Sequence, residues 1–245
     1  MKNSLLTLTA VLIISFTACS PGNYKDNTLT SSELKEGWKL LFDGVSHRGW
    51  INAKTGEFPS TGWEIKDGTL LITPESKGEN GGGDIVTEGK FRNFEFQVDF
   101  NYTPGANSGI KYFVDTERNG GELRSIGCEY QILDDKMNPD AQAGISGNHK
   151  LACLYDLIPP VNVNDKGPGA WNRAKIVVKG NHVQHWLNGE LTVEYERGNE
   201  KWKELVGKSK YKDIEGFGMT ESGRILLQDH GGKVAFKNIK IREIL

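Results

Sequence analysis

Residues 126–135, IGCEYQILDD, set a carboxylate and an amide side by side on what reads as one β-strand. Apolar and polar residues alternate, so Glu129 and Gln131 share one face, and Asp134 and Asp135 follow the strand directly. Paired carboxylates can serve as acid and base in the cleavage of a glycosidic bond. A solvated sheet face followed by turn-forming aspartates would give the same pattern. The segment therefore predicts either a sugar-binding face or an ordinary polar surface.

A second group of candidate residues lies in LLQDHGG, residues 226–232. If this segment is a strand, Gln228 and His230 lie on the same face. Histidine titrates near neutral pH and can act as a base, an acid or a metal ligand. The structural alternative is a histidine at a strand end that hydrogen-bonds a neighbouring loop.

A third group lies in SGNHKLACLYDLIPP, residues 146–160, beside a glycine-rich loop. Loops of this kind often carry functional sites. Lys150 could steady an oxyanion and His149 could take a proton, with Tyr155 and Asp156 close by in the sequence. Ordinary loop polarity is the alternative interpretation of the same residues.

Other chemistries find little support. His182 and His185 are three residues apart and would lie on opposite strand faces, so we expect both to be structural. No HExxH motif, CxxC pair or EF-hand loop occurs. The segments GGGD (81–84) and GFG (216–218) precede no predicted helix, which argues against phosphate loops. The spacing identifies no metal ligands and no certain cofactor, although a divalent cation would suit the chemistry described below.

Tryptophan side chains can pack in a core or stack on sugar rings. Trp63 and Trp186 lie within predicted strands, so we expect them in the core. Trp50 and Trp171 occur in loop-like surroundings, which leaves them open to ligand contact. Trp171 is therefore a candidate substrate-binding residue.

The elements that would position these residues are mostly β-strands. FEFQVDFNY, residues 94–102, alternates strictly between apolar and polar residues. Segments 174–196 and 223–244 contain further strands, and the first of these has glycine and asparagine turns suited to hairpins. Residues 63–72 form a further hairpin around an Asp-Gly turn.

Only residues 31–37 and 201–211 look helical, and both segments are short. Many short strands with turn signals, and no helices between them, predict an all-β fold with an antiparallel β-sandwich. Each strand of a sandwich has one core face. The polar face of residues 126–135 would then be the outer surface of one sheet, where concave curvature could form a groove for an extended ligand.

Residues 1–19 have the features of a bacterial lipoprotein signal peptide, with an apolar run too short for a typical membrane span. FTAC resembles a lipobox, in which Cys19 becomes the acylated N-terminus. Ser20, in place of aspartate, favours the outer membrane by resemblance. An ordinary cleaved signal with an incidental cysteine is the alternative. We expect a lipid-anchored protein of the bacterial cell envelope that contacts the membrane only through its lipid anchor.

Residues 20–33 are polar and lack periodicity, which predicts a flexible tether. Residues 34–245 would then form one β-sandwich domain. The formal charge of −2, with no basic block, argues against a nucleic-acid partner. Beyond the lipobox, Cys128 and Cys153 are too few for a disulfide framework, and we expect two buried free thiols.

Seven motifs follow the order of one known family. They are WKLLFDGVSHRGW (38–50), WEIKDGTL (63–70), GGGDIVTEGKFRNFEFQVDF (81–100), PGANSGIKYF (104–113), GCEYQILDD (127–135), WNRAKIVVKGNHVQHWLNG (171–189) and ILLQDHGGKVAFKNIKIRE (225–243). The chain resembles the 3-keto-disaccharide hydrolase family, formerly a domain of unknown function, in the style of lipoproteins from gut Bacteroidetes. The resemblance spans essentially the whole predicted domain and implies a concanavalin A-like jelly roll.

The resemblance also implies a substrate, namely a glycoside already oxidised to a ketone at carbon 3 of one ring. Such a ketone acidifies the proton on carbon 2, so a base can remove it to form an enolate. The aglycone then leaves from carbon 1, and water adds to the unsaturated ketone. This chemistry needs a base poised near neutrality, an enolate stabiliser and a proton donor for the leaving oxygen. A bound divalent cation could also stabilise the enolate.

Within this resemblance His149 or His230 is the expected base, and Glu129 is either the base or an acceptor that orients a hydroxyl. The remaining candidates would contact the sugar: Gln131, Asp134, Asn107, Lys150, Gln228, Asp84 and Trp171. One departure is visible. Many members carry an arginine shortly after NSGI, where this chain has Phe113, so no contact from that arginine is expected.

Two other functions fit the same residues. A non-catalytic carbohydrate-binding lipoprotein would need stacking aromatics but no base, because a jelly roll serves binding proteins as readily as enzymes. An ordinary glycoside hydrolase would act on unoxidised sugars through two carboxylates. Glu129 has no carboxylate two residues away, which argues against that mechanism.

Overall fold

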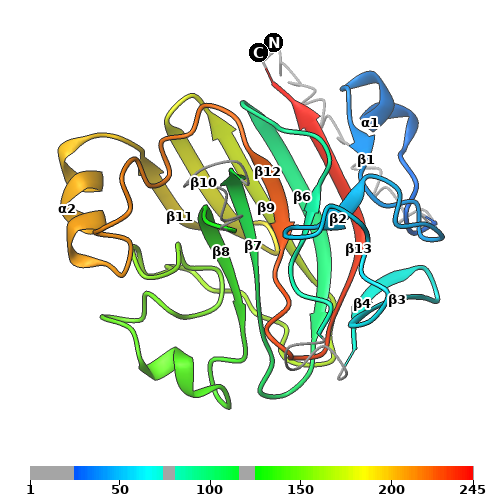
Figure 1. The fold of residues 1–245 in the computed structure, drawn as a ribbon, viewed down its shortest axis with the longest axis horizontal. Coiled ribbons are helices and arrows are strands. Elements are labelled where there is room, and N and C mark those ends of the chain that lie inside the picture. The colour runs from blue at the N-terminus through cyan, green and yellow to red at the C-terminus, as the bar shows by residue number, and fades with distance from the viewer. Residues whose placement is uncertain (1–24, 74–80, 116–124, 245) are drawn as a thin grey trace, which may run out of the picture.

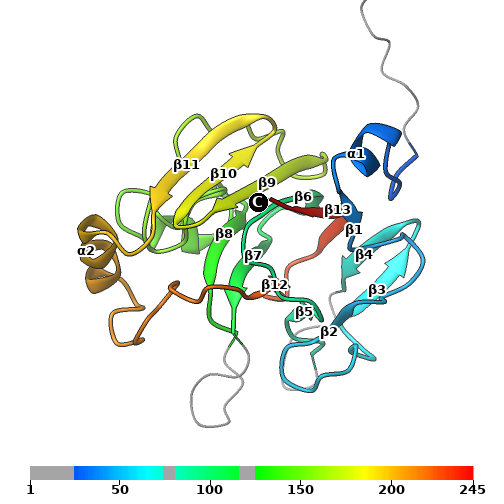
Figure 2. The same cartoon turned by 90° about the horizontal axis from the view of Figure 1, so that it is seen from above.

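The computed structural model describes residues 25–73, 81–115 and 125–244, which form two antiparallel sheets packed face to face (Figure 1). The two sheets are separate layers in the view from above (Figure 2). The larger sheet has the strand order β11-β10-β9-β6-β13-β4-β3, with β1 also paired to β13, and the smaller has the order β2-β5-β12-β7-β8. The predicted all-β sandwich is confirmed.

The larger sheet consists of β1 (Lys39–Leu40), β3 (Trp63–Lys66), β4 (Thr69–Ile72), β6 (Phe94–Tyr102), β9 (Asn172–Lys179), β10 (His182–Leu187), β11 (Glu190–Glu196) and β13 (Val234–Glu243). The smaller sheet consists of β2 (Trp50–Asn52), β5 (Ile85–Thr87), β7 (Asn107–Val114), β8 (Cys128–Leu133) and β12 (Arg224–Leu227). Short helices lie at α1 (Ser31–Lys35) and α2 (Glu200–Lys208), with a 3-10 turn at η2 (Pro139–Gln142).

Alternation along the strands builds the core between the two sheets. Phe94 and Phe96 of β6 are fully buried, and they pack in one cluster with Ile110 of β7 and Tyr130 of β8. Each of these strands therefore gives one face to the core, as a two-layer sandwich requires. The opposite face of the smaller sheet remains available for a site.

Hairpin turns fix the register of the larger sheet. Asn188 and Gly189, between β10 and β11, both have positive φ, as do Asp67 and Gly68 between β3 and β4. Two consecutive residues with positive φ are typical of the type I′ turn, whose twist matches that of paired strands. The hairpins predicted at both places are confirmed.

The N-terminal segment differs from the prediction. Asn27 is buried, its backbone N–H donates to Asn238 Oδ1 at 2.6 Å, and its Oδ1 accepts from the backbone N–H of Asn238 at 2.8 Å. Asn27 Nδ2 also donates to the Gly68 carbonyl, and Glu33 of α1 forms an ion pair with Lys240 of β13. The flexible tether predicted over residues 20–33 is therefore wrong for the part from Asn27 onward, because paired polar groups fasten it to the sheet.

Two further predictions concern cysteines and the membrane. Cys128 and Cys153 are buried free thiols, as expected. Cys19 and the rest of the predicted signal peptide lie outside the described residues. No helix in the described part of the chain is long and apolar enough to cross a membrane.

Candidate active site

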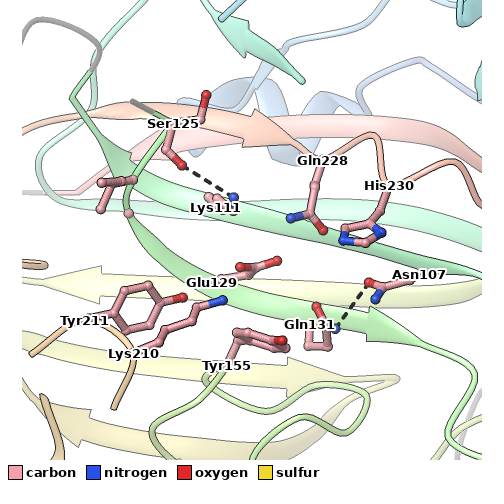
Figure 3. A pocket seen from close by; sticks show the side chains of 12 residues that line it. Asn107, Lys111, Ser125, Glu129, Gln131, Tyr155, Lys210, Tyr211, Gln228 and His230 are labelled. Atoms are coloured by element: carbon pink, nitrogen blue, oxygen red, sulfur yellow. Dashed lines mark hydrogen bonds between the residues drawn. The ribbon is translucent and has the colours of Figure 1, made fainter. Parts of the chain in front are cut away.

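The outer face of the smaller sheet carries a hollow of about 250 Å³. Its lining is mostly polar and comes from β7, β8, the residues just after β12 and three further connecting segments (Figure 3). The lining residues are Asn107, Lys111, Ser125, Ile126, Gly127, Glu129, Gln131, Tyr155, Lys210, Tyr211, Gln228 and His230. A second hollow of about 380 Å³ shares Asn107, Tyr155 and His230 with the first, so the two adjoin, and together they are called the groove.

Strand pairing assembles the floor of the first hollow. In the β7–β8 pair, Lys111 lies directly opposite Glu129, and Gly109 lies opposite Gln131. Side chains opposite each other on one sheet face are near neighbours. Because Ile110 and its neighbours on β8 point into the core, Lys111, Glu129 and Gln131 point outward together. The sugar-binding face predicted for residues 126–135 is the floor of this hollow.

Glu129 lies at the centre of the floor (Figure 3), and only 3% of its surface is exposed. Gly109 makes room for it, since a Cβ at that position would overlap Glu129 Oε1. Burial raises the pKa of Glu129 above its ordinary value, and the Asp84 carboxylate adds to the rise, whereas the ammonium groups of Lys111 and Lys210 oppose it. The result is a shielded carboxyl group between two cations, which suits proton transfer.

Lys111 and Lys210 are functional candidates that sequence reasoning missed. Lys111 lies on the same face of β7 as Asn107 and Gly109, because these residues are two apart in the strand. That spacing could have indicated its position beside the predicted site. Lys210 follows α2, and its Nζ lies 4.1 Å from the centre of the Tyr155 ring. Burial lowers the pKa of Lys210, which makes it a better proton donor than an exposed lysine. No local pattern connects residue 210 with strand β8.

Amide groups and a histidine line the rest of the groove. Gln131 Nε2 donates to Asn107 Oδ1 at 3.3 Å, while its buried Oε1 has no hydrogen-bond partner among the described residues. The backbone N–H of Gln228 donates to the Gly109 carbonyl, which holds the end of β12 beside β7. His230 is exposed and lies where the two hollows meet. The structure therefore brings these four predicted residues together in one groove.

Asp84 lies beside the hollow and does not line it. Its Oδ1 accepts a hydrogen bond from the backbone N–H of Asp229 at 2.9 Å. Burial raises its pKa, and the charges of Lys111 and His230 oppose the rise. Asp84 therefore acts on the site through its charge, as its influence on the pKa of Glu129 indicates.

His149 occupies a different position from the one predicted. Its ring lines neither hollow and is held between two carboxylates, with Nδ1 3.0 Å from Asp140 Oδ1 and Nε2 3.0 Å from Asp156 Oδ1. It also stacks on the ring of Tyr155, with centroids 4.3 Å apart. Both ring nitrogens are engaged, so His149 is not placed to remove a proton from a ligand in the groove. Tyr155, which does line the groove, was the better candidate in this segment.

Two more predicted contacts, Asp134 and Lys150, lie outside the groove. Asp134 accepts hydrogen bonds from the backbone N–H groups of Gly105, Lys136 and Met137, so it forms a turn after β8 instead of binding a sugar. Burial opposes ionisation of this carboxyl, but those three donors lower its pKa. Lys150 lines neither hollow.

Trp171 lies on the larger sheet, away from Glu129. It lines a separate open hollow of about 530 Å³ together with Arg173 and Asn188. Lys237 Nζ lies 4.3 Å from the centre of its ring, which covers one face. Trp171 therefore does not contact a ligand in the groove, because the loop before β9 belongs to the other layer of the sandwich.

No metal centre can be assigned. Among the described residues, no group of three or more histidine, cysteine, aspartate or glutamate side chains is placed to hold a metal ion. The groove instead supplies positive charge through two lysines.

Comparison with known proteins identifies the family. Residues 37–242 match the 3-keto-alpha-glucoside-1,2-lyase-like domain. The chain is 34% identical over 228 residues to the 3-keto-disaccharide hydrolase of Bacteroides thetaiotaomicron. This alignment covers 84% of this chain and 78% of that protein.

Two crystal structures of candidate glycosyl hydrolases from Parabacteroides distasonis are also similar. The first is 32% identical with a TM-score of 0.79, and the match covers 90% of this chain and 100% of the other. The second is 26% identical with a TM-score of 0.61, covering 84% and 99%. The sequence match and the shared fold both extend over most of the chain. The chain therefore belongs to the family of 3-keto-alpha-glucoside-1,2-lyase-like domains, the carbohydrate-active family that its seven motifs resemble.

Proposed function

We propose that this protein cleaves 3-keto-glycosides, including 3-keto-disaccharides, by elimination and hydration in the groove on the smaller sheet. Family membership and the activity named for the Bacteroides thetaiotaomicron relative support the substrate class. The observation that carries the mechanism is the buried Glu129 carboxyl beside two lysines. A base next to fixed positive charge is what enolate formation requires.

Glu129 is the base in this mechanism. The ketone at carbon 3 acidifies the proton on carbon 2, and the Glu129 carboxylate takes that proton. Its raised pKa makes it a stronger base than an exposed glutamate. His230 lies at the rim, where it can contact the sugar or the leaving group.

Lys111 stabilises the enolate. Lys111 lies opposite Glu129 in the β7–β8 pair. A sugar whose carbon 2 approaches Glu129 would bring the ketone oxygen, bonded to the neighbouring carbon 3, toward the Lys111 ammonium group. Negative charge that develops on this oxygen is then compensated by a fixed cation in a partly water-excluded site. Gln131, Asn107 and Gln228 offer amide groups for the ring hydroxyls.

Lys210 donates the proton that the leaving group needs. The bond between carbon 1 and the glycosidic oxygen breaks, the enolate electrons form the double bond between carbons 1 and 2, and the oxygen takes a proton from Lys210. Water then adds to carbon 1 and returns a proton to Lys210. The proton on Glu129 exchanges with solvent before Glu129 protonates carbon 2. The products are the free aglycone and the 3-keto sugar, and both side chains recover their starting states.

One assay tests this function directly. The protein is incubated with a glucoside and with its 3-keto derivative, and aglycone release is followed. Release from the 3-keto compound alone is expected, because without the ketone the proton on carbon 2 is far too weakly acidic. In deuterated water the sugar product should carry deuterium at carbon 2, after correction for exchange without enzyme. Rapid cleavage of the unoxidised glucoside would favour an ordinary hydrolase, and binding without turnover would favour a binding module.

The same protein is proposed to be lipid-anchored in the bacterial cell envelope at the outer membrane. The support is the FTAC sequence before Ser20 and the polar residues that follow. Acylation of Cys19 would hold the sandwich near the membrane while leaving the groove free to bind glycosides.

A further inference from the structure

A network of five side chains lies behind the wall of the groove, with His149 at its centre. The His149 ring is 3.0 Å from one oxygen of Asp140 and 3.0 Å from one oxygen of Asp156. Both ring nitrogens of His149 are therefore engaged by carboxylate oxygens. His149 therefore joins two carboxylates that would otherwise repel each other.

Each of these two carboxylates also accepts a hydrogen bond from a residue that lines the groove. Asp140 Oδ2 accepts from the Tyr155 hydroxyl at 3.0 Å, and Asp156 Oδ2 accepts from the backbone N–H of Lys210 at 2.7 Å. Lys210 Nζ in turn lies 4.1 Å from the centre of the Tyr155 ring. The network thus ends at both groups that form one wall of the first hollow.

The local backbone is built around this network. A Cβ at Gly144 would overlap the His149 ring, so glycine at that position leaves room for the imidazole. Asp156 has a φ of 61°, a left-handed conformation that aims its carboxylate at both His149 and the segment after α2. Tyr155 is fixed from the other side, because its backbone N–H donates to the Glu129 carbonyl at 3.0 Å. The wall and the proposed base are therefore held in one frame.

We propose that His149 is a positioning residue for the leaving-group side of the reaction: through Asp156 it holds Lys210 at the glycosidic oxygen, and through Asp140 it holds Tyr155 against Lys210. This inference rests on the proposed function, in which Lys210 is the proton donor. His149 itself contacts no ligand. Its loss would leave proton removal by Glu129 largely intact and would weaken protonation of the departing oxygen.

A comparison of leaving groups tests the proposal. A sugar alkoxide leaves slowly unless it is protonated, whereas 4-nitrophenolate needs no proton from the enzyme. His149→Gln should therefore lower kcat on a 3-keto-disaccharide by about 10- to 100-fold, yet lower kcat on 4-nitrophenyl 3-keto-glucoside by less than about 3-fold. Lys210→Met should show the same selectivity, and the double variant should lose little beyond Lys210→Met alone.

Two matched variants complete the experiment. His182→Gln removes another histidine–carboxylate pair, with Glu194 at 2.9 Å on the larger sheet, and should change neither rate. Asp156→Asn keeps a residue that tolerates positive φ and weakens the same link, so it replaces His149→Gln if that variant does not fold. The role of His149 would be overturned if His149→Gln lowered kcat equally on both substrates. It would also be overturned if the fold-loss in kcat of the double variant equalled the product of the two single losses. A wild-type protein that releases neither leaving group would overturn the proposed function, and this inference with it.

Discussion

Replacement of Gly109 by alanine tests the placement of the proposed base. A Cβ at this position would overlap Glu129 Oε1 and lie within 3.1 Å of two further Glu129 side-chain atoms. The carboxyl group is the far end of a rotatable side chain, so it can move aside and the sheet can still form. The move needed to restore ordinary contact is about 1 Å, and a misplacement of that size can cost about 100-fold in rate.

We therefore expect Gly109→Ala to lower kcat on a 3-keto-glucoside by about 100-fold while the protein stays folded. The measurement is aglycone release, paired with the melting temperature of the same sample. Gly207→Ala is the matched control, because nothing lies within 4 Å of a Cβ there and its position in α2 favours alanine. An unchanged kcat in Gly109→Ala would refute the view that the position of the Glu129 carboxyl limits the reaction.

Four further predictions follow from the contacts described above. Glu129→Gln should lower kcat by about 100-fold or more and retain binding of the parent glycoside, as calorimetry can measure. Because the pKa of Glu129 is raised and its ionised form is the base, the acid limb of the kcat/KM profile should lie above pH 4.5, and Lys111→Met should move that limb higher by removing a charge that favours the carboxylate. Asn27→Ala should reduce the free energy of unfolding by about 1–3 kcal/mol in urea titrations, since it removes the side-chain hydrogen bonds to the backbone of Asn238 and Gly68. Cys19→Ser should leave a folded protein that no longer fractionates with membranes, and continued membrane association would contradict the lipid anchor.

Local alternation predicted the parts of the site that lie on strands. Glu129 and Gln131 on β8, and Gln228 at the end of β12, could be placed on outer faces because a period of two decides which side chains enter the core. The family resemblance then indicated that these faces belong to one site, and the match over residues 37–242 confirmed the family. The fold and the groove floor were therefore accessible from sequence.

Residues on loops could not be placed in this way. His149 and Lys150 stand in a segment that reads as a functional loop, but tertiary contacts turn His149 toward two aspartates and leave Tyr155 facing the groove. Lys210 comes from the segment after α2, 81 residues beyond Glu129 in the sequence, and no periodic pattern spans such a separation. The N-terminal segment was misjudged for a related reason, since the partners of Asn27 lie at Gly68 and Asn238.

The two halves of the proposed catalytic machinery rest on supports of unequal strength. Lys111 and Glu129 lie on paired strands joined by backbone hydrogen bonds, whereas Lys210 lies in the connection between α2 and β12, at the end of the sandwich where α2 lies (Figures 1 and 2). Segments outside the central ladder open with smaller free energies than the sheet itself. Amide hydrogens of β7, which has strand partners on both sides, should then exchange only with global unfolding, while those around residue 210 exchange through local opening. As temperature rises, the protein would lose its ability to expel poor leaving groups before it loses its ability to form an enolate.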